Sequence, residues 1–425
     1  MRQSLHLLTR DRIPEATAWR YGYLVVQGGL SLLLYLVLAA ALSTDAFNAA
    51  ATALGVLVIA QAISDFGFSQ AAVAVLPNPL AYGRVVNSED MDAGAAAAFL
   101  VGSIAAAMLC CLAALAVPSA GRLPVVLVAP AAATSVLLAG LDGLLRSRGD
   151  FSRPILYVTL SRLAAFCAVP VAFATESASL TCAAVSAGSL LGAAPALRDT
   201  TRVIRSGDPR PTTVPFLRAA APLGVSNLMI VGGTRVNTIV LAASASLTAA
   251  AVFESAWRLF QLGQYLIGGA ATAVAPFIAS ALARGEHLEV RRLIVRWAGA
   301  LVAAACLFGG ALLALRGPVC DAAFGGLGGA VSRALIPLAI VLPLNVLLLL
   351  ATVTQAARSS HDRVLVMLAY AAGAVVNLAL VVALKRSDPM LAGSLAVASG
   401  ITIAMGVVAV RFVPLLRSVD PARHG

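Results

Sequence analysis

Long apolar runs dominate this chain, and short polar segments between them hold most of its charge. Several runs extend for about 20 residues, the length at which an α-helix crosses a hydrocarbon core of about 30 Å. They lack the polar–apolar alternation of membrane β-barrel strands, so helices must satisfy their backbone groups. The pattern therefore predicts an all-α, polytopic membrane protein.

Proline, glycine and charge clusters mark the ends of the apolar runs. They predict about 12 transmembrane helices. The first run is too long for a signal peptide and is expected to be retained. The predicted spans are 21–42, 47–76, 93–117, 123–145, 154–174, 178–197, 219–242, 249–281, 297–316, 333–356, 363–384 and 390–411.

The distribution of basic residues predicts the orientation of these spans. Most of the 30 Lys and Arg residues lie in alternate loops, which places both termini in the cytoplasm by the positive-inside rule. The net charge of +11 then reflects topology and anionic lipid, and no nucleic-acid partner is expected. The predicted parts are a cytoplasmic N-terminal segment (1–20), an N-terminal six-helix lobe (21–197), a cytoplasmic linker (198–218), a C-terminal six-helix lobe (219–411) and a cytoplasmic tail (412–425).

An internal repeat relates the two predicted lobes. A shift of about 200 residues aligns 49–51 with 249–251, Gln61 with Gln261 and Pro77 with Pro276. Six spans per lobe return each repeat to the same side, so the repeat is parallel. We expect two lobes around a central cavity that opens to either side, which is the architecture of alternating access. A channel or a structural bundle that happens to be duplicated is the alternative.

The sequence lacks the motifs of soluble enzymes. It has no Gly-rich phosphate loop, no H-E-x-x-H and no G-x-S-x-G. Its histidines all fall in predicted cytoplasmic segments, and its cysteines show no metal-ligand spacing. We expect no enzymatic activity, no cofactor and no metal.

Arginines inside the predicted spans are the strongest functional signal, because an intramembrane charge is costly unless it is paired or hydrated. The predicted eighth span carries Glu254, Arg258, Gln261 and Tyr265 at spacings of four, three and four, so they share one helical face. The equivalent face of the second span includes Gln61 and Asp65. We expect both polar stripes to face the cavity.

Depth along the helices suggests pairs among these charges. Arg235 and Glu254 both fall roughly 8–11 Å below the outer surface, where they can pair across neighbouring helices. Arg258 then lies a turn deeper. Asp65 and Arg162 both lie toward the cytoplasmic side and form a second candidate pair.

Two interpretations of these residues stay open. In the first, arginines attract an anionic headgroup such as a pyrophosphate and glutamines bind sugar hydroxyls. In the second, the same groups fix helix packing through ion pairs, with Asp65 and Glu254 as ion-coupling or pairing candidates. The predicted substrate-binding residues are Arg258, Arg235, Arg162, Gln61, Gln261 and Gln264.

Three segments resemble bacterial polysaccharide flippases, which export lipid-linked oligosaccharides of the O-antigen type. They are the Asp-Phe-Gly turn in 64–70, the aromatic-Ala-Arg-Leu pattern in 253–259 with Pro276 downstream, and the Phe-Gly loop at Phe324 and Gly325. These flippases belong to the multidrug/oligosaccharidyl-lipid/polysaccharide exporter (MOP) superfamily. The resemblance implies that this chain flips a polyprenyl-pyrophosphate-linked oligosaccharide across a bacterial inner membrane, beside envelope polysaccharide polymerases or glycosyltransferases.

Several features separate this chain from related transporters. Peptidoglycan-precursor flippases usually carry two further spans, and drug antiporters of the superfamily often carry an acidic residue in the first span, where this chain has Gln27. The basic-glycine loop of major-facilitator transporters is missing between residues 77 and 92. A small-molecule or drug cation antiporter of the same superfamily and a non-transporting membrane scaffold are the alternative functions.

Overall fold

The computed structural model describes residues 13–76, 87–232, 235–283, 287–358 and 360–417, and every regular element in these ranges is a helix. Pro77, the first part of the predicted N-terminal segment and the end of the predicted tail lie outside them. The chain forms two compact units, Met1–Val231 with Thr238–Glu254, and Gly232–Asn237 with Ser255–Gly425. Each unit is described by itself.

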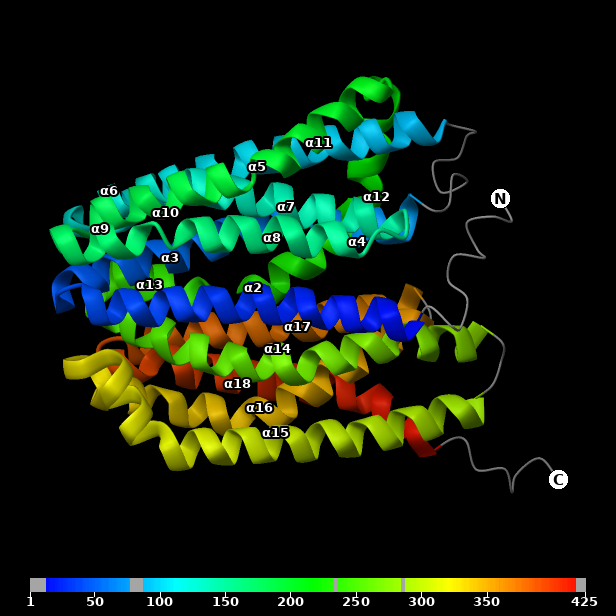
Figure 1. Cartoon of the computed structure of the whole chain (residues 1–425). Coiled ribbons are helices and arrows are strands. Elements are labelled where there is room, and N and C mark those ends of the chain that lie inside the picture. The colour runs from blue at the N-terminus through cyan, green and yellow to red at the C-terminus, as the bar shows by residue number, and fades with distance from the viewer. Residues whose placement is uncertain (1–12, 77–86, 233–234, 284–286, 359, 418–425) are drawn as a thin grey trace. The chain divides into compact units, whose positions relative to one another are not determined.

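The first unit is a bundle of helices (Figure 1). Its helices are α2 (Ile13–Ala41), α3 (Thr44–Asp65), α4 (Phe68–Val75), α5 (Ser88–Ala116), α6 (Ser119–Leu127), α7 (Ala129–Ser147), α8 (Ser152–Ala165), α9 (Ala168–Thr175), α10 (Ala178–Gly192), α11 (Ala194–Ser206) and nearly all of α12 (Arg210–Gly232).

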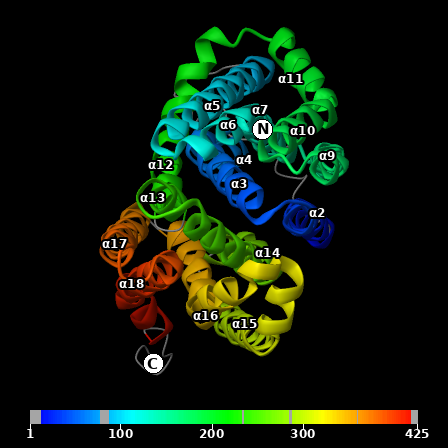
Figure 2. The same ribbon diagram turned by 90° about the vertical axis from the view of Figure 1, so that its left-hand side faces the viewer.

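The second unit is built around three long helices that lie side by side in the view along their axes (Figure 2). They are α16 (Gly328–Arg358), α17 (Ser360–Leu384) and α18 (Pro389–Arg417). α15 (His287–Phe324) packs directly on α16, and the short 3-10 turn Gly325–Leu327 connects the two helices. Helices α13 (Val236–Ser244) and α14 (Leu247–Ala283) contribute residues to both units.

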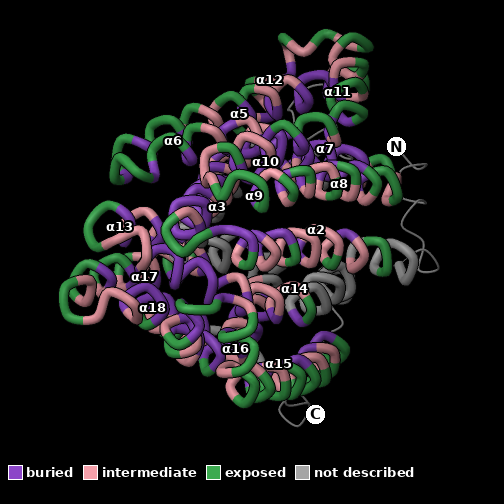
Figure 3. Tube along the Cα trace, turned by 60° about the vertical axis from the view of Figure 1, so that its left-hand side comes forward, coloured by how far each residue is buried: buried purple, intermediate pink, exposed green. Residues whose placement is uncertain are grey.

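The helices have the length and apolar character of membrane spans. Within the described residues, seven candidate spans are long and apolar enough to cross a membrane, and two bent helix pairs would raise the number to nine. Many leucine, isoleucine and valine side chains are exposed, and Figure 3 shows exposed positions along α15. The predicted all-α, polytopic membrane fold is confirmed.

Proline explains where the two bent pairs break. α6 and α7 meet at 41°, and α10 and α11 meet at 51°. Pro130 and Pro195 occupy the first turns of α7 and α11, where the missing N–H costs no intrahelical hydrogen bond. Each proline therefore starts a new helix that departs from the axis of the preceding one.

Aromatic rings and small residues hold the first unit together. Phe68, Phe99 and Phe216 form a buried triangle with ring centroids 5.9–6.2 Å apart. Gly188 and Gly192 on α10 lie directly against the backbone of α8. Their spacing is the small-xxx-small pattern that lets two membrane helices approach closely.

Buried amides perform the same task in the second unit. Asn237 and Asn377 are both 0% exposed and exchange two hydrogen bonds of 2.9 Å, while Asn237 also donates to the carbonyl of Gly393 at 2.9 Å. These bonds tie the start of α13 to α17 and α18. Hydrogen bonds between asparagine side chains are typical contacts between packed membrane helices.

Candidate functional site

Arg235 immediately precedes α13 and is only 5% exposed. Its Nη2 donates a 2.9 Å hydrogen bond to Oε1 of Gln261 on α14, and its guanidinium carbon lies 4.9 Å from the ring centre of Trp257. A cation over an indole face is electrostatically favoured, the more so when desolvated. The structure thus brings two of the predicted binding residues together and fixes the direction of the guanidinium.

The polar contact continues along α14. The amide nitrogen of Gln261 donates a 2.7 Å hydrogen bond to the hydroxyl of Tyr265, one turn further on. The shared helical face that spacing predicts is therefore confirmed for these two residues. Arg258 and Gln264 lie on the same helix and are partly exposed, so both remain candidates for binding. We refer to Arg235, Trp257, Gln261 and Tyr265 as the α13–α14 polar network.

Glu254 belongs to the first unit and is fully buried. Its carboxylate accepts a 3.1 Å hydrogen bond from the hydroxyl of Thr238. The same carboxylate packs beside Gly55 of α3, where an added Cβ would come within 3.0 Å of it. Because Arg235 belongs to the second unit, the pairing of Arg235 with Glu254 stays a prediction.

Asp65 lies at a break in the predicted second span. α3 ends at Asp65, Phe66 and Gly67 adopt left-handed conformations with φ of 39° and 71°, and α4 then begins. The carboxylate of Asp65 accepts long hydrogen bonds of 3.4 Å from the backbone N–H and the hydroxyl of Ser69. Glycine at the second left-handed position avoids the penalty that a Cβ would add.

A second carboxylate lies near this break. Asp142 on α7 forms a 2.7 Å ion pair with Arg146, one turn later, and both charges interact electrostatically with Asp65. The backbone of Ser69 lies directly against Gly143 of α7. Asp65 therefore lies close to the ion pair of Asp142 and Arg146.

Gln61 and Arg162 are partly exposed positions of the first unit. Gln61 lies one turn before Asp65 on α3, and Arg162 lies in the last turn of α8. The pairing of Asp65 with Arg162 stays a prediction. The substrate-binding and ion-coupling roles of the predicted residues likewise remain predictions after their positions are known.

The sequence did not single out Trp257 and Thr238, which contact Arg235 and Glu254. Trp257 lies one turn before Gln261 on α14. An aromatic partner on that helix could therefore have been expected for Arg235. Thr238 carries no comparable signal, because its contact depends on how α13 meets α14. Among the described residues no group of histidines, cysteines or carboxylates could hold a metal ion.

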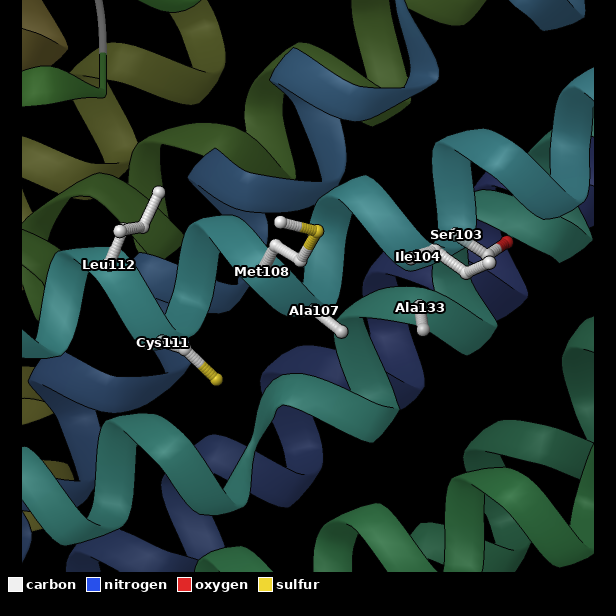
Figure 4. Close-up of a pocket in the computed structure, with 7 residues that line it drawn as sticks. All are labelled: Ser103, Ile104, Ala107, Met108, Cys111, Leu112 and Ala133. Atoms are coloured by element: carbon white, nitrogen blue, oxygen red, sulfur yellow. The ribbon is translucent and has the colours of Figure 1, made fainter.

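A separate hollow of about 470 Å³ lies on the outer side of α5 and α7. Figure 4 shows Ile104, Met108 and Leu112 projecting from α5 beside the small side chains of Ala107 and Ala133. The hydroxyl of Ser103, which also lines it, donates to the carbonyl of Phe99 at 2.8 Å. A hollow with this apolar lining is unsuited to a glycan or a pyrophosphate.

These helices and buried charges define a polytopic membrane protein of the kind that carries polar groups inside its bundle. No protein-family model and no curated protein matches the sequence. Solved structures do match over almost the whole chain. The chain is similar to an inward-facing multidrug resistance MATE family transporter of the MOP superfamily, with a TM-score of 0.72, 15% identity, and coverage of 95% of this chain and 100% of that one.

Two further structures extend the likeness. The lipid II flippase MurJ in an inward closed conformation gives a TM-score of 0.70 at 12% identity, covering 92% of this chain and 88% of that one. A MOP superfamily transporter from Pyrococcus furiosus gives 0.65 at 13% identity, covering 97% of each chain. The chain therefore has the fold of MOP-superfamily transporters, in agreement with the resemblance seen in its sequence.

Proposed function

We infer that this chain is a secondary transporter that flips a polyprenyl-pyrophosphate-linked oligosaccharide from the inner to the outer leaflet by alternating access. Its place would be the inner membrane of a bacterium, with both termini in the cytoplasm. The product would supply envelope polysaccharide biosynthesis, where polymerases or glycosyltransferases are the expected partners. The fold, shared with both a lipid flippase and drug transporters, supports transport without choosing the substrate.

The α13–α14 polar network is the observation that carries the choice of substrate. A charged side chain inside the hydrocarbon core costs about 2.5–3.5 kcal/mol on insertion scales unless it is compensated. A buried arginine in a membrane span is therefore a candidate binding residue. A guanidinium matches a phosphate geometrically, because its planar fork can donate two parallel hydrogen bonds. Glutamine and tyrosine beside it supply the neutral donors and acceptors that sugar hydroxyls need.

The first span supports the same choice. An exchanger of cationic drugs needs negative charge where cation and substrate bind, and the predicted first span offers Gln27 in place of an acid. The candidate residues in the second unit are instead cationic, amide-bearing or aromatic. A site of this composition favours an anionic, hydroxyl-rich headgroup over an organic cation.

A deletion strain gives the direct test of the substrate. We expect one completed oligosaccharide-lipid to accumulate on the cytoplasmic face, measured by mass spectrometry of lipid-linked glycans in inside-out and right-side-out membrane vesicles. Re-expression of the wild-type gene should remove the accumulation. An unchanged lipid-linked pool, with no second flippase expressed, would contradict the proposal.

Variants of the network test the site itself. Arg235→Gln should lower the rate of complementation at least tenfold while the protein level in the membrane stays normal, and Arg258→Ala should act in the same direction. Arg386→Gln is the matched control, because it removes one positive charge from an exposed position. Normal transport by Arg235→Gln would show that the network has only a structural role. If the Arg235→Gln protein does not accumulate in the membrane, Arg235→Lys keeps the charge and tests whether the geometry of the guanidinium is needed.

A small-molecule cation antiporter is the second candidate, favoured by the fold shared with a multidrug resistance transporter. An antiporter should raise drug resistance when overexpressed and should change the internal pH of proteoliposomes on addition of substrate. A flippase of a lipid-linked oligosaccharide should do neither when a drug is added. A non-transporting scaffold should tolerate Arg235→Gln and Arg258→Ala in the complementation assay.

A further inference from the structure

Helix α11 differs from the apolar helices around it. It continues α10 past the proline bend and runs alongside α5 (Figure 1). Ala196 and Thr200 point into the protein and are fully buried. Arg198, Arg202 and Arg205 are all exposed and follow one another at spacings of four and three, so they share the opposite face of the helix. We call these three arginines the α11 basic face.

Three contacts fix the direction of this face within the first unit. The hydroxyl of Tyr157 on α8 donates to the carboxylate of Asp199. After α11 ends, the backbone N–H of Asp208 donates a 2.8 Å hydrogen bond to the carboxylate of Asp90 on α5. Gly207 lies against the backbone of Glu89, too close for any side chain. These contacts attach α11 and the residues that follow it to α8 and α5, and the α11 basic face lies on the exposed side of the helix.

The charges on this face are largely uncompensated. Elsewhere in the same unit, Arg146, Arg148 and Arg153 each form an ion pair with a carboxylate. On α11, Arg202 lies 3.5 Å from Asp199, whereas neither Arg198 nor Arg205 has an acidic partner within the described part of the chain.

The distance of the α11 basic face from the start of α10 can be compared with the dimensions of a bilayer. Leu190 and Leu191 at the end of α10 are 49% and 74% exposed, as expected for side chains in contact with lipid tails. Along the axis of α10 from Ala178, with the 51° bend into α11 taken into account, Arg198 lies about 27 Å away and Arg205 about 34 Å away at 1.5 Å per residue. A hydrocarbon core is about 30 Å thick, and the headgroups extend the bilayer to about 40–45 Å.

We propose that the α11 basic face is a docking surface for anionic phospholipid headgroups of the leaflet predicted to be cytoplasmic. The phosphodiester of such a lipid can accept paired N–H donors from an arginine, while its tails continue along the exposed leucines of α10. Each basic residue near a negatively charged membrane surface strengthens binding about fivefold. The surface would tie the first unit to anionic lipid whatever substrate the chain carries.

Binding of phosphatidylglycerol and phosphatidylcholine to the purified full chain tests the proposal, with native mass spectrometry as the readout. The wild type should retain phosphatidylglycerol, and Arg198→Gln with Arg205→Gln should weaken its retention at least about tenfold. Arg333→Gln with Arg386→Gln is the matched control, because it removes the same charge from two exposed positions. The control should retain phosphatidylglycerol nearly as the wild type does.

Four results would overturn the proposal. Equal losses in the two double variants would show that net charge alone attracts the lipid. Equal retention of phosphatidylcholine would remove the role of negative charge. Displacement by inorganic phosphate at the same concentration as by phosphatidylglycerol would indicate a soluble-anion site. Finally, Arg198→Lys with Arg205→Lys keeps both charges, so a loss as large as that of the glutamine variant, together with a lowered melting temperature in both variants, would point to altered folding.

Discussion

The Asn237–Asn377 pair permits a quantitative test of how the second unit holds α13. The two amides exchange a pair of hydrogen bonds at full burial. Hydrogen bonds between membrane helices contribute on average about 0.6 kcal/mol and at most about 1.7 kcal/mol each. Two bonds therefore predict a coupling energy of about 1–3 kcal/mol, which is larger than the error of additivity between independent sites, about 0.5 kcal/mol.

A double-mutant cycle measures that coupling. Asn237→Ala and Asn377→Ala should each destabilise the protein by about 1–3 kcal/mol, because each substitution leaves the other buried amide without its hydrogen-bond partner. The double variant should cost less than the sum of the two. Unfolding in mild detergent with added sodium dodecyl sulfate, followed by tryptophan fluorescence, gives the free energies. Single-variant effects that add within about 0.5 kcal/mol would refute the idea that the pair acts as one unit.

Three further predictions test local features of the first unit. Gly188→Val should lower the stability by about 1–3 kcal/mol in thermal unfolding, because its side chain would enter the backbone of α8, whereas Gly299→Ala, with open space around it, should be neutral or stabilising. Gly67→Ala should cost about 1–2 kcal/mol in the same assay, because φ is 71° there; an unchanged melting temperature would mean that the break at α4 relaxes freely. Tyr157→Phe should cost about 0.5–1.5 kcal/mol by removing the bond to Asp199 and should speed hydrogen exchange in α11, and unchanged exchange would show that this bond does not hold the helix.

Much of the fold could be predicted because bilayer thickness sets the length of apolar runs. The interruptions were harder to predict. The predicted span 47–76 is two helices, α3 and α4, because Phe66 and Gly67 take left-handed conformations that hydropathy does not encode. The predicted span 297–316 corresponds to α15, His287–Phe324. Polar residues beyond the apolar run also keep helical hydrogen bonds, so hydropathy underestimates the length of the helix.

The candidate site could be predicted as residues but not as contacts. Arg235 and Gln261 were both expected from their position in apolar spans, since an intramembrane charge or amide rarely lacks a partner. Their mutual hydrogen bond depends on the rotation of α13 against α14, which one sequence does not specify. Similarly, the segment predicted as a linker, 198–218, is mostly the helices α11 and α12. The basic character of that segment could be seen in the sequence. The sequence did not show that Ala196 and Thr200 are buried, which places the arginines of α11 on the exposed face.

The hollow on α5 and α7 also provides a chemical reporter. Cys111 lines it, is exposed and forms no disulfide, and apart from Ser103 the other side chains that line the hollow are apolar. A thiol reacts as its thiolate, a form that requires water or a nearby positive charge. In an intact bilayer Cys111 should therefore resist a charged maleimide and become labelled when detergent or solvent replaces lipid there. The native sequence thus carries its own probe of whether this face of the bundle stays dry.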